Sequence, residues 1–506
     1  MVTRVTNQAQ QANSLQNIFR ITEKLFKAQQ EISTGKRINR PSDDPAGIRD
    51  ALVLRTNLHQ SNQFVKNIVN NRIFIEASDS SLQSINLSLT RAKELSVGEL
   101  GGLSSAETRN FAALEIDQLI SQVFDSANTR VKNRFIFSGT NVRAKPFNSE
   151  TSGAVYIGNS ESFKVGVENN LSIDFGIPGC KALATDLNPK ITTSTNLSSL
   201  NGGIGITAGS FSVSDRAGNT ANITVNSTDN IGSLISKINS ASVNVTASIN
   251  SNGRGLQLID TNNVISQALT ISEVSGGTTA ADLGILGRKN GTLFGSDLNP
   301  IITISTLVPD LECGNGIILN DVKIINGAAS ATVTLSSAST IGDVIDKING
   351  AGLNVTASIN SAGKSLQIKS NDSNTIAIAR NIGTDETAEN LGLGGGRNVF
   401  NTLFKLKDAL TKNDTAAILA SLENLDSSLE SVNNSRAIIG ASLSRVDSKS
   451  LVHEQEIVNR SLQLSNIEDA DIVKSASDLA NLEFALQATL SSTAQIIQPT
   501  LLDFLR

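Results

Sequence analysis

Apolar residues near the N-terminus recur in alternating steps of three and four, the spacing of one helix face. The members of this stripe are Leu15, Ile18, Thr22, Leu25, Gln29 and Ile32. Phe19 and Phe26 widen it on one flank. A break rich in glycine and proline follows at 35–45. Asp44 then stands where an N-cap belongs and Pro45 at the first helical position, so a second helix is predicted from residue 45.

The second predicted helix carries one apolar column at multiples of seven residues. Its members are Leu54, Ile68, Ile75, Leu82 and Leu89. Glycines at 98, 101 and 102 end this helix. Ser104 and Glu107 have the spacing of a capping box, which predicts the start of a third helix with Ile116, Ile120 and Val123 on one face.

The C-terminal third contains the longest seam of apolar positions. It consists of Ile418, Leu422, Leu425, Leu429, Val432, Arg436, Ile439, Leu443, Val446, Ser450, His453, Ile457, Arg460, Leu464 and Ile467. A seven-residue repeat held this long indicates a supercoiled helix. After Asp469 and Asp471, a last helix places Ile472, Ala476, Leu479, Leu486, Leu490 and Ile497 on one face.

None of these helices is apolar all round, so each needs a partner. The N-terminal and C-terminal seams are the obvious partners for one another. We therefore expect one terminal bundle in which the following residues pair: Leu15, Ile18, Leu25 and Ile32 with Leu479, Leu486, Leu490 and Ile497. Arg37, Asp43 and Asp44 are expected to fix the bend between the terminal helix and the next one.

The middle of the chain is an internal repeat. Asp186-Leu187-Asn188-Pro189 recurs 111 residues later, at 297–300. The eight residues 244–251 recur identically at 354–361. Each copy has the pattern of a strand, a short helix and a hairpin. The sequence therefore predicts a mainly α-helical coiled-coil rod, formed by paired N- and C-terminal segments, with a β-rich (α+β) two-repeat insert in the middle.

Composition excludes several classes of protein. A formal net charge of −5 gives no basic surface for nucleic acid, so no nucleic-acid partner is expected. No apolar run approaches the ~20 residues of a membrane helix, and the first thirty residues lack the apolar core of a secretory signal peptide. Cys180 and Cys313 are the only cysteines, too few for a disulfide framework, and we expect ordinary thiols whose pairing the sequence leaves open.

Catalytic motifs are incomplete. His59 and His453 are the only histidines, and Ile457 stands where a zincin helix beginning at His453 needs its second ligand. The glycine-rich stretch 392–397 lacks the Lys-Ser/Thr pair of a phosphate loop and is better explained as a hinge. We therefore expect no enzyme, no cofactor and no metal site.

The segment at 33–47, Ser-Thr-Gly-Lys-Arg-Ile-Asn-Arg-Pro-Ser-Asp-Asp-Pro-Ala-Gly, resembles the signature of the flagellin superfamily. The acidic segment 467–471 and the closing 501–505 are similar to the C-terminal part of that superfamily. The modules at 204–262 and 317–372 resemble its hook IN motif. Residues 134–147 are similar to the members that join hook to filament, rather than to filament flagellins.

The resemblance implies a structural component of the bacterial flagellum that joins hook to filament by assembly of its terminal helices. It implies these domains: a terminal polymerisation domain (1–45 with 468–506), a coiled-coil rod (46–148 with 398–467), a β bridging segment (149–183), and two IN repeats (184–294 and 295–397). Implied partners are the chain itself, hook-associated protein 1, flagellin and a flagellar export chaperone. The implied location is extracellular, in the flagellum, reached without a cleaved signal peptide.

Two alternatives stay open: a filament flagellin, and a flagellar adhesin whose β-rich insert binds glycans. In either case the unpaired apolar stripes predict that residues 1–40 and 470–506 are frayed in the free monomer and become ordered on polymerisation.

Overall fold

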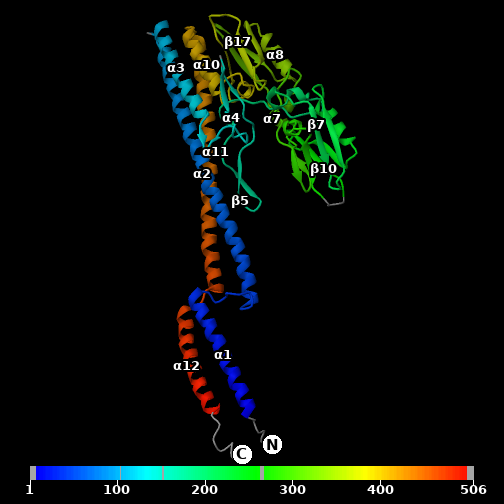
Figure 1. The fold of residues 1–506 in the computed structure, drawn as a ribbon. Coiled ribbons are helices and arrows are strands. Elements are labelled where there is room, and N and C mark those ends of the chain that lie inside the picture. Colours follow the sequence, from blue (N-terminus) through cyan, green and yellow to red (C-terminus); the bar gives the residue numbers. More distant parts are fainter. Residues whose placement is uncertain (1–6, 103, 151–152, 263–266, 498–506) are drawn as a thin grey trace, which may run out of the picture. The chain divides into compact units, whose positions relative to one another are not determined.

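The computed structural model describes residues 7–102, 104–150, 153–262 and 267–497. Six helices of at least thirteen residues lie near the two ends of the chain (Figure 1): α1 (Asn7–Thr34), α2 (Pro45–Glu99), α3 (Ala106–Ala127), α10 (Val399–Thr411), α11 (Thr415–Glu468) and α12 (Ile472–Ile497). All strands lie between α3 and α10 in sequence. The predicted class, long terminal helices around a β-rich middle, is confirmed.

The chain divides into two compact units, each described here by itself. The first consists of 1–70, 166–172 and 445–506, and the second of 71–165 and 173–444, within the described residues. Helices α2 and α11 contribute residues to both units because they cross the dividing positions in sequence.

The predicted seven-residue columns are buried over most of their length, while Leu54 on α2 and Arg460 and Ile467 on α11 are half-buried. On α11 the column Ile418, Leu425, Val432, Ile439 and Val446 is at most 3% exposed. On α2 the buried members are Ile68, Ile75, Leu82 and Leu89. In the second unit Arg436, which interrupts the seam, places its Nε 2.9 Å from Asp79 Oδ1 on α2. The pairing of the N-terminal and C-terminal seams is therefore confirmed for α2 and α11.

Helix α3 begins one residue later than its predicted cap implies. Ser105, not Ser104, is the N-cap: its hydroxyl accepts from the Thr108 backbone N–H at 3.2 Å, and Thr108 Oγ1 accepts from the Ser105 N–H at 3.0 Å. The Ser104 hydroxyl instead donates to the Gly98 carbonyl. The prediction of a Ser104–Glu107 box is wrong because threonine at the third helical position serves as well as glutamate.

A set of short elements follows α3 in the second unit and extends into the first. They are β1 (Arg130–Val131), β2 (Arg134–Phe135), β3 (Phe147–Glu150), β4 (Gly153–Tyr156), β5 (Lys164–Glu168), β6 (Leu171–Asp174) and α4 (Gly179–Ala182). The β3–β4 hairpin packs Phe147 and Tyr156 together, with ring centroids 5.2 Å apart. The Tyr156 hydroxyl donates to the Phe137 carbonyl at 3.0 Å, and the Phe137 side chain is fully buried.

The first repeat forms two small sheets and two short helices. Their strand orders are β12-β11-β7-β8 and β13-β10-β9. The elements are 3₁₀ turns at Leu197–Ser199 and Asn201–Gly203, β7 (Gly209–Ser214), β8 (Thr220–Val225), α5 (Ile231–Asn239), β9 (Val245–Ile249), β10 (Leu256–Asp260), β11 (Leu269–Glu273), α6 (Thr279–Asp282), β12 (Gly287–Lys289) and β13 (Leu293–Phe294).

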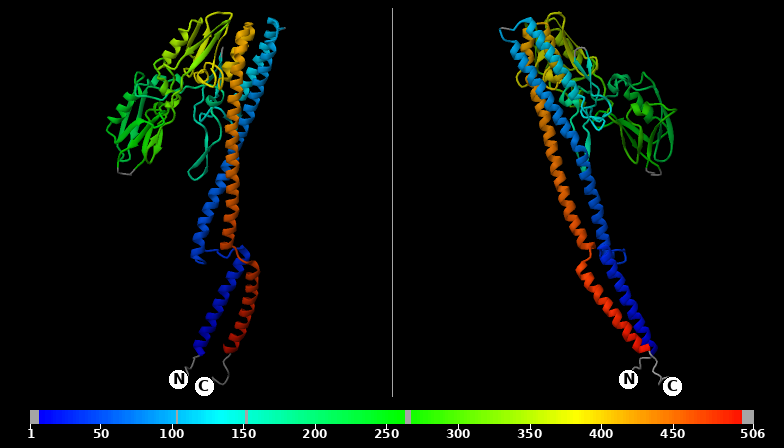
Figure 2. Two further views of the ribbon diagram at one scale, coloured as in Figure 1. Left: turned by 180° about the vertical axis from the view of Figure 1, so that it is seen from behind. Right: turned by 60° about the vertical axis from the view of Figure 1, so that its left-hand side comes forward.

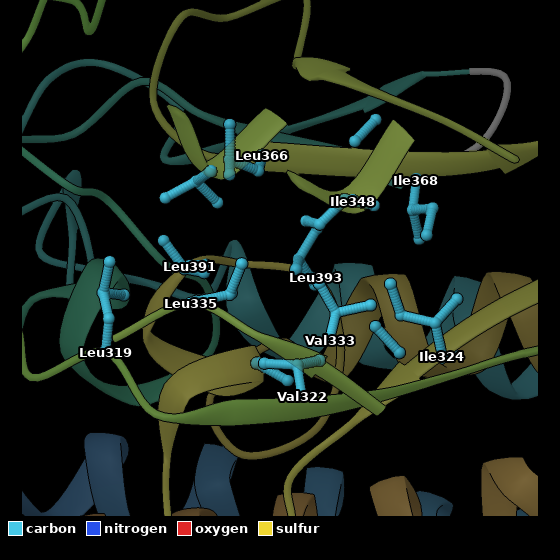
Figure 3. Packing of buried hydrophobic residues seen from close by; sticks show 14 of the residues in the cluster. Leu319, Val322, Ile324, Val333, Leu335, Ile348, Leu366, Ile368, Leu391 and Leu393 are labelled. Carbon is cyan, nitrogen blue, oxygen red and sulfur yellow. The ribbon is translucent and has the colours of Figure 1, made fainter. Parts of the chain in front are cut away.

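The second repeat has sheets of order β15-β14-β18 and β16-β17. Its elements are a 3₁₀ turn at Val308–Asp310, α7 (Leu311–Gly314), β14 (Asp321–Asn326), β15 (Ala329–Thr334), α8 (Ile341–Asn349), β16 (Val355–Ile359), β17 (Leu366–Ser370), β18 (Ala377–Arg380) and α9 (Thr387–Asn390). The predicted strand, helix and hairpin are present, and β14 and β18 add to them. Leucine, isoleucine and valine side chains from these elements meet in one core (Figure 3).

The two repeats exchange their leading segments. Leu187, ahead of the first repeat, is buried in the core of the second, and Leu298, ahead of the second, is buried in the core of the first. The exchange is reciprocal in the backbone: the Leu187 N–H donates to the Lys364 carbonyl at 2.8 Å and the Leu298 N–H to the Arg254 carbonyl at 2.9 Å. Each repeat therefore completes the core of the other. The boundary at 294/295 stays a prediction, since core packing crosses it.

We expect Leu298→Ala to destabilise the first repeat, although Leu298 follows that repeat in sequence. Removing a fully buried leucine side chain costs about 2–5 kcal/mol, and Leu298 is 1% exposed. Hydrogen exchange should accelerate in α5 more than in α8, and Leu187→Ala should show the opposite preference. Leu286→Ala, at a half-exposed leucine of the first repeat, is the control. Faster exchange in α8 than in α5 for Leu298→Ala would contradict the exchanged packing.

Candidate functional site: the paired terminal helices

Helices α1 and α12 lie side by side in the first unit, and the blue and red helices in Figure 2 show the same pairing from two further directions. Two hydrogen bonds join them near the turn that precedes α12. The Ala470 N–H donates to the Gly35 carbonyl at 2.9 Å, and the Ser475 hydroxyl donates to a carboxylate oxygen of Glu31 at 3.1 Å. The two ends of the sequence thus form one helical pair.

The residues expected to pair across this contact differ in burial. Ile18, Leu25, Ile32, Leu479 and Leu486 are half-buried. Leu15 and Leu490 remain about half exposed, at 51% and 49%. Ile497 ends α12, and its side chain lies outside the described residues. The two helices pair as expected, while the residue-by-residue pairing stays a prediction.

Large apolar side chains cover the outer surface of the helical pair. Phe19 and Phe26 on α1 are 71% and 64% exposed, and Val473 and Phe484 on α12 are 82% and 75% exposed. Two helices have too little surface to bury apolar side chains on every face. Exposed apolar clusters of this kind mark protein interaction sites.

A buried carboxylate connects the turn between α1 and α2 to the end of α11. The Glu468 side chain is 2% exposed, and its Oε2 lies 3.0 Å from Lys36 Nζ and 2.7 Å from Arg55 Nη2. The Glu468 carbonyl also accepts from the Arg37 N–H at 2.6 Å. Burial by itself would raise the pKa of Glu468, but the hydrogen bonds from Arg55 and Lys36 outweigh burial and hold it below its ordinary value.

Arg37, Asp43 and Asp44 occupy the same turn. Arg37 Nη2 donates to the Ile467 carbonyl at 2.7 Å and lies 3.4 Å from Asp44 Oδ2. Asp44 Oδ1 accepts from the Gly47 N–H at 2.9 Å, so Asp44 caps α2 as the sequence predicts. That hydrogen bond lowers the pKa of Asp44.

Asp43 stabilises the turn through hydrogen bonds to residues three and four positions before it. Its Oδ2 accepts from the backbone N–H groups of Arg40 at 2.8 Å and Asn39 at 3.0 Å. These two hydrogen bonds lower the pKa of Asp43. The geometry fits the expected role in fixing the bend, which stays a proposal.

Sequence reasoning missed Glu468, the residue with the most buried charge in this turn. In the sequence, the acidic segment 467–471 is notable only for its family resemblance, which assigns Glu468 no role of its own. The signal was indirect: Lys36 and Arg37 lie in the bend and Arg55 in the first part of the next helix, and such cations favour nearby carboxylates.

Histidine and cysteine take structural positions. His453 is buried and stacks on Phe64 with ring centroids 5.3 Å apart. Its Nε2 forms a hydrogen bond with the Val167 carbonyl oxygen at 2.6 Å. Cys180 is a buried free thiol, and burial raises its pKa to about 12. The side chain of Cys313 lies outside the described residues.

Within the described ranges no group of three potential metal ligands comes together. None of the helices described there is both long and apolar enough to cross a membrane.

Paired terminal helices with a repeated β insert define a class of flagellar structural proteins, and family models agree. The bacterial flagellin N-terminal helical region matches residues 5–142, and the C-terminal helical region matches 422–505. The flagellin hook IN motif matches 210–262 and 320–372. The chain belongs to the flagellin superfamily.

Among individual relatives, flagellar hook-associated protein 3 of Escherichia coli is 29% identical over 181 residues, which is 35% of this chain and 56% of that protein. The flagellar filament 33 kDa core protein of Treponema phagedenis is 32% identical over 125 residues, 25% of this chain and 42% of that protein. The chain thus spans about half the length of the curated relatives it matches. A solved structure of flagellar hook-associated protein 3 from Legionella pneumophila aligns with 82% of this chain and 98% of its own, at 15% identity and a TM-score of 0.37.

Proposed function

We propose that this chain is a structural component of the bacterial flagellum that joins hook to filament, assembling through α1 and α12. The observation that carries the proposal is the set of exposed apolar side chains on this helical pair, which the flagellin N-terminal and C-terminal family models match. Hook-associated protein 3 and a filament core protein both match the chain, and the match to hook-associated protein 3 covers the longer stretch, 181 against 125 residues, which supports the junction role.

The mechanism is assembly by burial of apolar surface. Burying apolar side chains contributes roughly 25 cal/mol per Å² removed from water, and phenylalanine supplies the largest areas. Phe19, Phe26 and Phe484 are available for this in the free chain. The turn around Glu468 holds α1 and α12 in one register, so that both present their outer faces to neighbouring copies together.

The partners follow from this role. A second copy of the chain would cover the outer faces of α1 and α12 in a ring or tube. Hook-associated protein 1 on one side and flagellin on the other would continue the same helical packing, and an export chaperone would cover the C-terminal helix before assembly. The location in this proposal is the extracellular flagellum.

Growth on isolated hooks tests the junction role. Purified protein is added to hooks that already carry hook-associated protein 1, and electron microscopy follows the result. A thin layer that stops growing and then accepts flagellin is expected. Long filaments made of this chain by itself would make it a flagellin, and the interpretation of residues 134–147 would be wrong.

We expect α1 and α12 to exchange their amide hydrogens much faster in the monomer than in the assembled state. A two-helix pair with exposed phenylalanines gains too little burial to hold its backbone hydrogen bonds closed. Hydrogen-exchange mass spectrometry of both states is the measurement, with residues 75–92 of α2 as the protected reference. The expected fraying includes residues 1–6 and 498–506, which lie outside the described residues. Strong protection of α1 in the monomer would contradict the expectation.

A further inference from the structure

The two repeats differ at one sheet edge. In the first repeat β10 pairs with β9 on one side and with β13 on the other. In the second repeat β17 occupies the position that β10 has in the first, and its pairing strand within the described chain is β16 alone. Among the described residues, the edge that β13 fills in one copy therefore carries no strand in the other.

Backbone geometry shows which groups face this edge. On β17 the Leu366 N–H donates outward to the Leu391 carbonyl at 2.9 Å, and on β10 the Leu256 carbonyl accepts outward from Gly295 at 2.7 Å. Outward and inward backbone groups alternate along an antiparallel strand, so Ile368, two residues beyond Leu366, also faces outward. Its counterpart Leu258 pairs with Leu293 of β13. The Ile368 side chain points into the core (Figure 3), which leaves its backbone at the edge.

A groove of about 330 Å³ adjoins this edge. Residues of β17 and β18 line it together with residues of α10 and its C-cap, Lys412. Gln367, Ile368 and Lys369 follow one another along the β17 side, and the Ile368 side chain between the two polar ones is buried in the core. A strand of a few residues, like the two-residue β13, is the shape that such an edge accepts.

The charge in the groove is positive. Lys369, Lys405 and Lys412 line it against one carboxylate, that of Asp408. Lys405 Nζ donates to the Leu393 carbonyl at 3.1 Å and Lys412 Nζ to the Thr375 carbonyl at 3.4 Å. Burial lowers the pKa of Lys405 to about 7, so a carboxylate placed beside it would restore its charged form.

We propose that the outer edge of β17 binds an extended acidic peptide segment as an added strand, with carboxylates directed at the lysines of the groove. The first repeat supplies the template for the backbone pairing, since β13 already occupies the equivalent edge. Main-chain hydrogen bonds give affinity in this mode of recognition, and the side chains beside the edge give selectivity. This site lies in the second unit and does not depend on the proposed assembly through α1 and α12.

The test uses the full chain and a synthetic peptide of alternating glutamate and leucine, labelled with fluorescein. Saturable binding by fluorescence anisotropy is expected, together with slower hydrogen exchange over 366–370 and unchanged exchange over 256–260. A peptide of alternating lysine and leucine should bind far more weakly. Exposed strand edges take up peptides by the same backbone pairing. The outer edge of β10 already carries β13, so residues 256–260 serve as the internal control.

Charge-reversal variants decide whether the groove is the site. Lys369→Glu combined with Lys412→Glu should weaken binding at least about tenfold, since two attractive charge pairs become repulsive. Lys289→Glu, at an exposed lysine of β12 outside the groove, should leave binding unchanged. Absence of saturable binding, binding without protection of 366–370, or equal weakening by Lys289→Glu would each overturn the proposal. Protection of 366–370 that rises with protein concentration without peptide would support it and identify a second copy as the source of the strand.

Discussion

Replacement of Leu490 by aspartate is expected to abolish incorporation of the chain into the flagellar structure while the β repeats stay folded. Leu490 is about half exposed in the free chain, so the substitution changes monomer stability little. In an assembled state its side chain is expected to be covered by a neighbouring copy. A carboxylate buried there without a partner costs at least about 3 kcal/mol at each contact.

Growth on isolated hooks and thermal unfolding of the monomer measure the two effects of Leu490→Asp separately. Gln487→Asp is the matched control, because it introduces the same charge at an exposed polar position of α12. Incorporation of Leu490→Asp at the rate of the unsubstituted chain would remove α12 from the proposed interface. An equal loss with Gln487→Asp would show that added charge on α12 is sufficient and that the apolar contact at Leu490 is not the cause.

The second large effect is expected at Glu468. Glu468→Gln removes the charge that Lys36 and Arg55 face, and we expect the turn to lose about 2–3 kcal/mol of local stability. This is less than a fully buried pair would lose, because the Lys36 and Arg55 side chains are each 43% exposed and water screens them. Hydrogen exchange in 31–38 measures the loss, with Glu454→Gln at an exposed position of α11 as the control.

The same carboxylate predicts a dependence on pH. The pKa of Glu468 is lower in the folded chain than in the unfolded one, so the unfolded state binds more protons in the acid range. Its contribution to stability is therefore complete above the unfolded pKa and is lost as the pH falls through the lowered folded pKa. Glu468→Gln should abolish this part of the acid destabilisation. An unchanged difference between the two proteins from pH 7 to pH 3 would contradict the role of the carboxylate.

The sequence predicted the helical framework well because its signals are local and periodic. The column on α11 and the column on α2 both proved buried over most of their length, and the Asp44-Pro45 start of α2 was correct to the residue. Helix starts depend on a few neighbouring residues and their hydrogen bonds. The error at Ser104 has the same origin, since Ser105 with Thr108 satisfies the same local rule one residue later.

The repeat was visible in the sequence, but its internal connections were not. Identical runs at 244–251 and 354–361 predicted two similar modules, which the structure contains. Similarity between the copies cannot show whether Leu187 and Leu298 each pack into the repeat that follows them in sequence or into the other repeat. In both arrangements the two leucines would be buried among similar apolar side chains, so their burial alone does not distinguish the arrangements. The three-dimensional positions of the two segments decide between them.

Periodicity and caps in the sequence by themselves determined the long helices, their apolar faces and the doubled insert, because these properties are set within a few turns of chain. Only the tertiary structure decided which side chains close the turn at Glu468, how the repeats exchange their leading segments and which edge of β17 pairs with no strand of the described chain. These features join residues up to 432 positions apart, such as Lys36 and Glu468. No local pattern encodes such a contact, because its free energy depends on burial and charge contributed by several segments at once.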